Sequence, residues 1–542
     1  MSAATAISRS PLAWTGERMI PCQSDIATEM FHWQRYLYFR PWYEGRKVID
    51  AASGEGYGIA YAGIFAKSAT GVDASGEAVA HARATYQTAE FNIADVVKFD
   101  YSQAELVLSF ETIEHLEDPR AFLSALKTCK GTIVISTPNR KTHSPGNRLE
   151  DKPLNPFHTV EWTPSEFADL VLAHFPTREV RFLSQEARWP GLIREGIDDN
   201  AMYCIAVIGG DELPKWPRVG ISIPTMSAGR TRDAVLSISR YYPGEIEFAI
   251  VANGCAQTEL TGLRDLAKDL PHMVHLIEEA ENLGYARGAN RGLEYLAQEA
   301  WFDYFAVSND DVYPSVDFLP QLVAAADELC ELGHRPGLIG GVSNEVNGAQ
   351  KVDIGHYSTI AEMQSRARLW NESNHSCANQ TRQIRGLFAL INPDCLNEVG
   401  GFDPRFGKGN FEDDDYNLRC HQAGFSIWQV QGAFLHHTGS ATFRELAVDY
   451  ESCVQRNLNL ILQKWGVHEF ADLWELPAES NQVYIPLTAK PELSGIEARI
   501  NGETVDLVDQ ASDLEFAAWI VREISQAGRD GRLKLLQALK AA

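Results

Sequence analysis

The sequence predicts an α/β protein in which two different sheets follow one another along the chain. Over residues 46–209, short apolar runs such as KVIDAA, AELVLSF and GTIVIST alternate with helical patterns, which is typical of a mostly parallel sheet covered by helices. The segment GGDELPKWPRVG, rich in Gly and Pro, indicates a linker. The alternation then restarts with VGISIP, IEFAIVAN, MVHLIEE and YFAVSNDD but repeats none of the earlier motifs, so we expect a fusion of two different domains.

The composition excludes several classes of protein. The 542 residues are 45% hydrophobic and 22% charged, which is globular composition. A net charge of −25 argues against a nucleic-acid partner, although backbone N–H groups and metals still allow nucleotides to bind. The nine cysteines form no C-x-x-C pair, and we find neither a signal peptide nor an apolar run of about 18 residues. We therefore expect a cytoplasmic protein with free thiols.

A glycine-rich turn and two strand-end acids in the first half predict a nucleoside site. The segment VIDAASGEGYG places Asp50 at the end of a strand, and Ser53, Gly54 and Gly56 in the turn before a helix. Such a turn lets a ligand approach the backbone closely. Asp73 ends the next strand, and an acid about 20 residues past a glycine turn can hold ribose hydroxyls. Taken alone, the turn is equally a tight strand–helix connection.

Over residues 14–209 the chain resembles the class I S-adenosylmethionine-dependent methyltransferases. The turn is similar to their motif I, with Ser53 where the usual Cys stands, and LVLSFETIEHLEDP, VISTPNR and NPFHTVEWTPSEF are similar to their later segments, including the lip of sugar-directed members. The resemblance implies a seven-stranded, Rossmann-like domain. It also implies that S-adenosylmethionine contacts Asp50, Ser53, Gly54, Gly56, Asp73, Asp95 and Glu111.

O-methylation of a sugar needs the donor sulfonium close to a hydroxyl and, usually, a base that takes the proton. His115, His158 and Glu111 are the candidates for this base, and a structural role for His115 at its strand end is weighed equally. A domain that binds the cofactor only as a scaffold or sensor is the alternative to an active methyltransferase.

Acidic motifs also mark the second half. YFAVSNDD ends in Asn309, Asp310 and Asp311, and acids at the carboxyl end of a strand face the ligand crevice of an open α/β sheet. Oxygen ligands there suit Mg²⁺ or Mn²⁺ carrying a diphosphate, while an acidic helix cap is the alternative. Further on, NFEDDDYNLRCHQAG contains four successive acids. They form a metal cage, a catalytic base with its neighbours, or a solvated helix start.

Taken in order, these motifs with GGFDPRFGKGNFEDDD and AFLHHTGSATF resemble family 2 glycosyltransferases of GT-A fold, especially the rhamnosyltransferase-like branch, over residues 217–464. The resemblance implies Asp413 as the base, with Glu412 beside it. It implies a metal bound by Asp311 and by His436 or His437. The donor-binding residues that it implies are Pro224, Thr225, Asn253, Gly284, Arg287, Asn290, Asp310 and Asp311.

The remaining acids and one departure from the family pattern lead to further expectations. We expect Asp414 to be an acid of a helix's first turn, favoured by the helix dipole, and Asp415 to make a structural hydrogen bond. Ala252 stands where relatives usually carry an acid, so UDP-, dTDP- and GDP-sugars all remain possible donors.

We expect a methyltransferase domain at residues 1–210, a linker at 211–216, a glycosyltransferase domain at 217–475 and an extension at 476–542 with an NGE-turned hairpin and amphipathic helices. The expected function is inverting, metal-dependent sugar transfer to a glycan or lipid-linked saccharide in surface-polysaccharide biosynthesis, with O-methylation of a glycan sugar. The end GRLKLLQALKAA either touches anionic lipid at the inner face of the cytoplasmic membrane or packs within an oligomer. A glycan-binding assembly factor is the non-enzymatic alternative.

Overall fold

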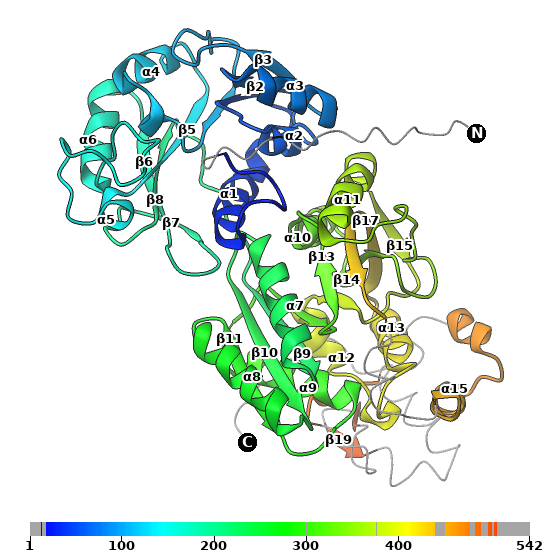
Figure 1. Cartoon of the computed structure of the whole chain (residues 1–542). Helices are drawn as coiled ribbons and strands as arrows, with labels where there is room; N and C mark the ends of the chain where they lie inside the picture. Colours follow the sequence, from blue (N-terminus) through cyan, green and yellow to red (C-terminus); the bar gives the residue numbers. More distant parts are fainter. Residues whose placement is uncertain are drawn as a thin grey trace. The chain divides into compact units, whose positions relative to one another are not determined.

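The computed structural model describes residue 12 and residues 18–299, 301–375, 377–439, 450–476, 483–488, 497–500 and 503–506. The chain divides into two compact units, Met1–Trp216 and Pro217–Ala542 (Figure 1). Both contain a sheet with helices, which confirms the α/β class and the presence of two different domains. Within the described ranges, no helix combines the length and the apolar character needed to cross a membrane.

The first unit contains one eight-stranded sheet. Its strands are β1 (Lys47–Ala51), β2 (Ser68–Asp73), β3 (Glu90–Ile93), β4 (Leu106–Ser109), β5 (Thr132–Pro138), β6 (Val180–Gln185), β7 (Ile193–Glu195) and β8 (Tyr203–Ile208). They are ordered β3-β2-β1-β4-β5-β8-β6-β7, with β1 to β5 parallel and β8 antiparallel to both neighbours. Seven strands form the expected sheet, and the three-residue β7 adds an eighth at the edge beside β6.

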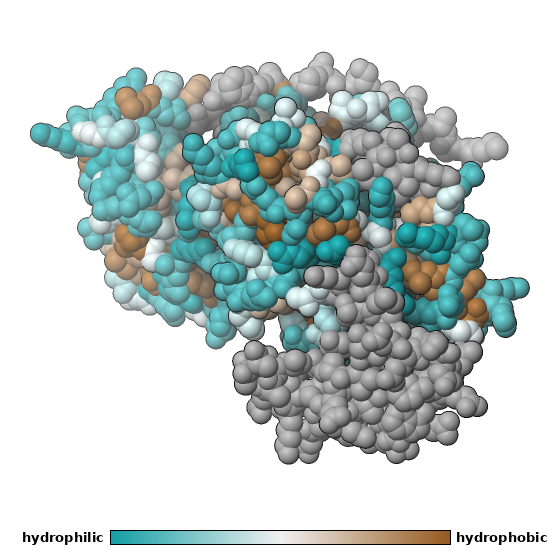
Figure 2. All heavy atoms as spheres, turned by 90° about the horizontal axis from the view of Figure 1, so that it is seen from below, coloured by the Kyte–Doolittle hydropathy of each residue, from teal (hydrophilic) through white to brown (hydrophobic). Residues whose placement is uncertain are grey.

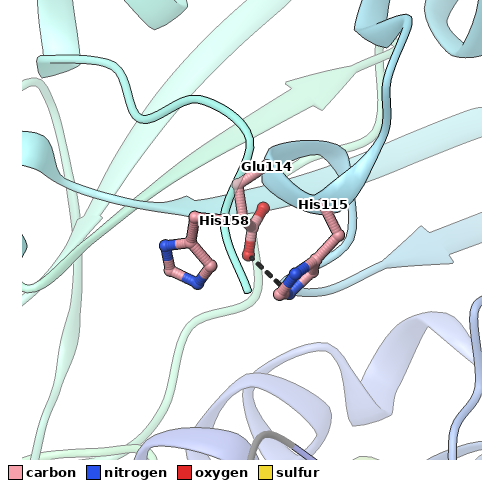
Figure 3. A group of neighbouring side chains, drawn as sticks. All are labelled: Glu114, His115 and His158. Carbon is pink, nitrogen blue, oxygen red and sulfur yellow. Dashed lines mark ion pairs between the residues drawn. The ribbon is translucent and has the colours of Figure 1, made fainter. Parts of the chain in front are cut away.

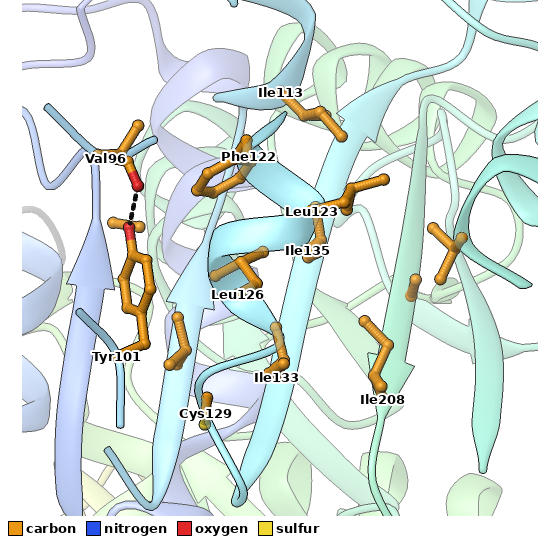
Figure 4. Packing of buried hydrophobic residues seen from close by; sticks show 14 of the residues in the cluster. Val96, Tyr101, Ile113, Phe122, Leu123, Leu126, Cys129, Ile133, Ile135 and Ile208 are labelled. Carbon is orange, nitrogen blue, oxygen red and sulfur yellow. Dashed lines mark hydrogen bonds between the residues drawn. The ribbon is translucent and has the colours of Figure 1, made fainter. Parts of the chain in front are cut away.

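Helices accompany this sheet, and the longer ones bury apolar side chains. They are α1 (Ile26–Tyr38), η1 (Arg40–Trp42), α2 (Tyr57–Ala62), α3 (Gly76–Thr85), η2 (Ile113–His115), α4 (Pro119–Leu126), α5 (Arg140–His143) and α6 (Pro164–His174). Helix α4 begins where the Asp118 side chain accepts a hydrogen bond from the Ala121 N–H (3.0 Å) and Pro119 fills the first position. Its Phe122 and Leu126 then pack in the core with Ile133 of β5 (Figure 4). This packing fixes the loops at the carboxyl ends of the strands.

The second unit contains a nine-stranded sheet. Its strands are β9 (Val219–Thr225), β10 (Ile246–Asn253), β11 (Val274–Glu279), β12 (Tyr304–Ser308), β13 (Val312–Pro314), β14 (Pro336–Ser343), β15 (Ala378–Thr381), β16 (Phe388–Ile391) and β17 (Ser426–His437). The order is β11-β10-β9-β12-β16-β14-β17-β13, and β15 pairs with β17. Strands β11, β10, β9 and β12 are parallel, whereas β16 runs antiparallel to β12. The parallel half therefore brings the carboxyl ends of β9, β10 and β12 to one edge.

Helices surround this sheet and extend beyond it. They are α7 (Ala228–Arg240), α8 (Gln257–Asp269), α9 (Tyr285–Glu299), α10 (Phe318–Glu331), α11 (Ile360–Asn374), α12 (Pro393–Val399), η3 (Pro404–Phe406), α13 (Glu412–Gln422), α15 (Tyr450–Trp465) and η4 (Phe470–Glu475). The predicted hairpin is confirmed, because β18 (Glu497–Ile500) pairs with β19 (Glu503–Asp506) and Ile500 lies opposite Glu503. The expected amphipathic helices, including GRLKLLQALKAA, lie outside the described residues.

The visible surface is predominantly hydrophilic. On the face shown in Figure 2, hydrophilic side chains surround small groups of apolar ones. Large apolar side chains that are more than half exposed among the described residues include Leu154, Trp301 and Leu332. The coloured part of this face is therefore mostly polar.

Candidate active sites

The glycine turn after β1 is held in shape by the acid that ends β2. The Asp73 carboxylate accepts hydrogen bonds from the Gly54 N–H (2.9 Å) and from the Ser75 N–H (2.8 Å), where α3 begins. Gly54 and Gly56 have φ angles of +56° and +100°, a region that favours glycine. A Cβ on Gly56 would also lie 2.8 Å from a ring carbon of Phe91. The turn therefore leaves its backbone free of side chains at the carboxyl edge of the sheet.

The other predicted cofactor residues surround this turn. Ser53 is buried; its N–H donates to the Val72 carbonyl (3.0 Å), and its hydroxyl has no hydrogen-bond partner in the described part of the chain. Asp95 is exposed just after β3, where it accepts a hydrogen bond from the Val97 N–H (3.0 Å) and pairs with Lys98. The hydrogen bond from Lys98 and that from the backbone lower the pKa of Asp95.

Asp50 is buried at the end of β1 and accepts a hydrogen bond from the Tyr36 hydroxyl (2.8 Å). Burial raises its pKa to about 7, and the charge of Asp73 acts in the same direction, against the effect of the Tyr36 bond. At neutral pH, both the protonated and the ionised form of the Asp50 carboxyl group are therefore populated.

The buried Asp50 predicts that the first unit loses stability as pH rises. Its pKa increases from 3.8 to about 7 on folding, so the folded state binds more protons between these values. We expect the stabilisation to be complete below about pH 4 and lost above about pH 7, a change of about 4 kcal/mol. Asp50→Asn should flatten this dependence, whereas Asp169→Asn on the exposed face of α6 should not. Hydrogen exchange of the β1 and β4 amides across this pH range measures the change in stability. An unchanged pH dependence in Asp50→Asn would contradict the assignment to Asp50.

Glu111 follows β4 in a strained conformation with a φ angle of +53°. The Ser136 hydroxyl donates to its carboxylate (2.6 Å) and accepts from its N–H (3.2 Å). The buried guanidinium of Arg35 lies 3.8 Å from the same carboxylate. These contacts hold Glu111 at the carboxyl edge of the sheet, just after β4, the strand that pairs with β1.

The two candidate histidines lie together, with a buried acid between them (Figure 3). Glu114 and His115 belong to η2, while His158 comes from the segment before α6. The two imidazole rings meet edge to face with centroids 4.9 Å apart, and His115 Nε2 lies 3.8 Å from Glu114 Oε1. Burial raises the pKa of Glu114 well above its usual range, and the charge of Glu111 raises it further.

Hydrogen bonds fix the orientation of both rings. His115 Nδ1 lies 3.0 Å from the Phe157 carbonyl oxygen, which can only accept, so Nδ1 donates and Nε2 carries the lone pair of the neutral ring. His158 Nδ1 lies 2.6 Å from the Glu161 carboxylate, and Asn155 contacts its Nε2 at 2.9 Å. Glu161 is not among the predicted site residues, although its position three residues after a histidine is a sequence signal for such a contact.

In the second unit, Asp311 follows β12 and faces the end of β17. Its carboxylate lies 3.2 Å from His437 Nε2, and the Asn309 amide lies 3.2 Å from the same nitrogen. His437 Nδ1 lies 2.8 Å from the Glu345 carbonyl oxygen, so Nδ1 donates and Nε2 points to Asp311. His436 instead contacts the Tyr357 hydroxyl through Nδ1 (2.7 Å). Of the two histidines, the structure therefore places His437 beside Asp311.

Asp310 points to the end of β9 rather than to His437. It accepts a hydrogen bond from the Thr225 hydroxyl (2.6 Å) and lies 3.3 Å from the Arg230 guanidinium. Burial raises its pKa despite these contacts. The neighbouring Pro224 packs against Gly288 of α9, where an added Cβ would lie 2.8 Å from the proline Cβ. The ends of β9 and β12 are thus joined by a short polar network.

The two predicted asparagines hold loops at the same edge. The Asn253 amide donates to the Gly284 carbonyl (3.1 Å), and its oxygen accepts from the Leu283 N–H (2.7 Å). Asn290 bonds both backbone groups of Phe402, each at 2.8 Å. Both side chains therefore form hydrogen bonds with backbone groups of the protein. Gly284, with a φ angle of +82°, approaches the Gly407 carbonyl closely, and Arg287 is half-buried on α9.

The four successive acids occupy the first turn of α13 but have different surroundings. Glu412 is buried, and burial together with the charge of Asp413 raises its pKa well above its usual range. The Asp413 side chain keeps 17% of its surface exposed and lies 3.5 Å from the Arg385 guanidinium. Asp414 lies 2.7 Å from Arg385 with only 3% of its side chain exposed. Asp414 is thus a first-turn acid as expected, but it is buried and paired, not solvated.

Asp415 is structural, as predicted. Fully buried, it accepts hydrogen bonds from Arg419 (2.9 Å) and from the Trp465 indole (3.0 Å), and Lys464 lies 2.6 Å away. Lys464 also lies 2.8 Å from the buried Asp403 of the GGFD segment. These contacts connect α13, α15 and the GGFD segment into one buried charged cluster.

Comparisons with known proteins agree with these two folds. Residues 25–178 match the family model of the methyltransferase domain, and residues 223–385 match that of glycosyl transferase family 2. Probable S-adenosylmethionine-dependent methyltransferases of Mycobacterium tuberculosis and Mycolicibacterium smegmatis are 37% and 38% identical to the chain over 178 and 172 residues. The matches cover 32% and 30% of this chain and 63% and 64% of theirs, so the chain spans just under two thirds of these relatives.

Solved structures are more distant. The methyltransferase domain of bacterial CtHen1 is 22% identical, with a TM-score of 0.27 over 33% of this chain and 100% of that one. The plantazolicin methyltransferase BpumL is 16% identical, with a TM-score of 0.28 over 34% of this chain and 86% of that one. From its two matched segments, the chain joins a methyltransferase domain to a family 2 glycosyltransferase domain.

Proposed function

We propose that the chain is a bifunctional enzyme that transfers a sugar from a nucleotide diphosphate donor to a glycan acceptor and O-methylates a sugar of that glycan. The observation that carries the proposal is the pair Asp311–His437, 3.2 Å apart beside the carboxyl end of β12. Ligand crevices of open α/β sheets lie at this edge. The match of residues 223–385 to glycosyl transferase family 2 supports the same activity.

Asp311 and His437 fit a divalent metal. The Glu345 carbonyl takes the Nδ1 proton of His437, and this kind of second bond orients metal-binding histidines in many proteins. Bound there, Mg²⁺ or Mn²⁺ supplies positive charge that offsets the charge of the leaving diphosphate. Asp310 stays with Thr225 and Arg230, so we assign it to shaping the donor site. Asn253 and Asn290 hold the loops around it in the same way.

Asp413 is the base that we assign to the acceptor hydroxyl. It is the acid of the run whose side chain is partly exposed, at 17%, whereas Asp414 and Asp415 are paired with cations inside the protein. The acceptor oxygen forms a bond to the anomeric carbon as the bond to the diphosphate breaks from the opposite face, and Asp413 takes the hydroxyl proton. Glu412 lies beside it, and Arg385 holds the Asp413 carboxylate in place.

The methyltransferase domain supplies the second step of the proposal. Asp73 and the glycine turn hold the nucleoside of S-adenosylmethionine, with Asp50, Ser53, Asp95 and Glu111 around them. The His115–His158 cluster lies after β4, on the same edge, and assists loss of the hydroxyl proton. A silent domain that only binds the cofactor is the competing proposal.

The wider setting rests on the resemblance of both halves to enzymes of glycan assembly. We place the enzyme in surface-polysaccharide biosynthesis at the cytoplasmic side of the membrane, with a glycan or lipid-linked saccharide as acceptor. UDP-, dTDP- and GDP-sugars are all candidate donors.

Release of nucleoside diphosphate tests the glycosyltransferase. The full chain is incubated with Mn²⁺ and a panel of nucleotide sugars, with and without an oligosaccharide acceptor. We expect slow hydrolysis of one donor, lost in Asp311→Ala and kept in Asp353→Ala, which replaces an exposed acid after β14. Equal release by Asp311→Ala and the unchanged chain would refute the assigned metal ligand.

A further inference from the structure

We propose that Glu114, His115 and His158 bind a divalent transition metal in the methyltransferase domain. Each side chain offers one ligand atom, and these atoms lie within 4.8 Å of one another. The inference rests on the proposed methyl transfer. The cluster follows β4, at the carboxyl edge of the sheet where the glycine turn also lies. It goes beyond that proposal by assigning a metal to a site to which the proposed function gives only an acid–base role.

The buried carboxylate is the first argument. Glu114 Oε2 accepts a hydrogen bond from the Thr137 hydroxyl (3.1 Å), while Oε1 has no hydrogen-bond partner within the described ranges. The side chain is fully buried, and Oε1 is the atom that faces His115 Nε2 at 3.8 Å. A buried carboxylate oxygen without a donor is unfavourable, and a cation between these atoms would compensate it.

The outer hydrogen bonds are the second argument. Each imidazole donates its Nδ1 proton to an oxygen of the protein, His115 to the Phe157 carbonyl and His158 to the Glu161 carboxylate. Both rings therefore present Nε2, the nitrogen that carries the lone pair. This arrangement, including the carboxylate–histidine pair, is usual around metal-binding histidines. The Asn155 amide, 2.9 Å from His158 Nε2, would have to rotate away on binding.

The ligand set indicates which metals fit. Two imidazoles and one carboxylate suit Zn²⁺, Mn²⁺, Fe²⁺ or Co²⁺ and leave coordination positions open. An acceptor hydroxyl bound there would lose its proton more readily, to water. Its oxygen then forms a bond to the methyl carbon, while the carbon–sulfur bond breaks and its electron pair stays on sulfur. The products are the methyl ether and S-adenosylhomocysteine.

Co²⁺ binding tests the site. The full chain, treated with a chelator and carrying His437→Asn to remove the other proposed metal site, is titrated with Co²⁺ by calorimetry and visible absorption. We expect one Co²⁺ per chain with the absorption of imidazole ligands. Glu114→Gln should abolish it, and Glu161→Gln should weaken it by about 10- to 100-fold. His174→Asn, at the end of α6, is the matched control and should bind normally.

Binding of S-adenosylmethionine to the same samples separates the outcomes. Glu114→Gln that keeps cofactor affinity but loses Co²⁺ supports the metal site, because the fold is then intact. A chain that binds the cofactor but takes up no Co²⁺, or binds it equally in Glu114→Gln, overturns the metal and leaves the methyltransferase proposal standing. Failure to bind S-adenosylmethionine in the unsubstituted chain overturns the methyltransferase proposal itself, and the metal inference falls with it.

Discussion

Asp413→Asn is expected to lower kcat for sugar transfer by about 10²- to 10⁴-fold, because the asparagine amide cannot take the acceptor proton. Its shape and its contact with Arg385 change little, and the assigned metal ligands Asp311 and His437 are untouched. Donor affinity should therefore stay near that of the unsubstituted chain. Initial rates with the identified donor and acceptor, together with donor binding by calorimetry, measure both quantities.

Asp414→Asn is the matched comparison for this substitution. Asp414 is adjacent in the same helical turn and pairs with the same Arg385, but it is buried. Its pKa is raised to about 7, chiefly by burial and then by the charge of Asp413. Removing this carboxyl group should reduce kcat far less than Asp413→Asn does. Equal losses in the two variants would show that the charge of the cluster matters rather than one base, and unimpaired transfer by Asp413→Asn would show that another group takes the acceptor proton.

Lys464→Met is expected to destabilise the glycosyltransferase domain by about 3–5 kcal/mol, because it removes one partner from a buried charged network. The lysine ammonium, with 5% of its side chain exposed, lies between the fully buried carboxylates of Asp403 and Asp415. Arg405 and Arg419 would still pair with these acids, but each acid would lose a neighbouring cation. Hydrogen exchange of α13 and α15 amides localises the loss to this domain.

Lys268→Met is the control for the lysine substitution. Lys268 is exposed in the last turn of α8, so its replacement should change the stability by less than about 0.5 kcal/mol. Exchange of β1 and β4 amides in the other unit should stay unchanged in both variants. If Lys464→Met exchanges no faster than Lys268→Met, the network does not contribute to stability as its burial indicates.

The features that sequence predicts here are those encoded over short stretches. Strands β1 and β2 formed at the apolar runs that lead to Asp50 and Asp73, as expected, since an apolar run followed by an acid indicates a buried strand without other information. Strand β18 also pairs with β19 as expected, because Asn-Gly between two strand patterns is a local signal in the sequence for a hairpin. Strand β7 escaped prediction, as three residues at a sheet edge are too short to show a period.

Pairings between distant residues could not be predicted in the same way. Arg385 reaches the acids of α13 across 28 residues, and Lys464 reaches Asp403 across 61. No sequence pattern assigns either basic residue an acidic partner, so only the folded chain shows the pairing. The sequence also could not show which of the adjacent His436 and His437 lies beside Asp311. It follows from the strand, whose successive side chains point to opposite faces, one to Tyr357 and the other to Asp311.

Two separate transferase sites on one chain should bind two ligands independently, and paired titrations test this most directly. The full chain, Asp73→Asn and Asp311→Asn are each titrated with S-adenosylmethionine and with a nucleoside diphosphate plus Mn²⁺. Asp73→Asn should lose about tenfold or more in cofactor affinity only, and Asp311→Asn a similar factor in nucleotide affinity only. Either ligand failing to bind the unsubstituted chain, or each substitution weakening both ligands alike, would contradict two independent sites.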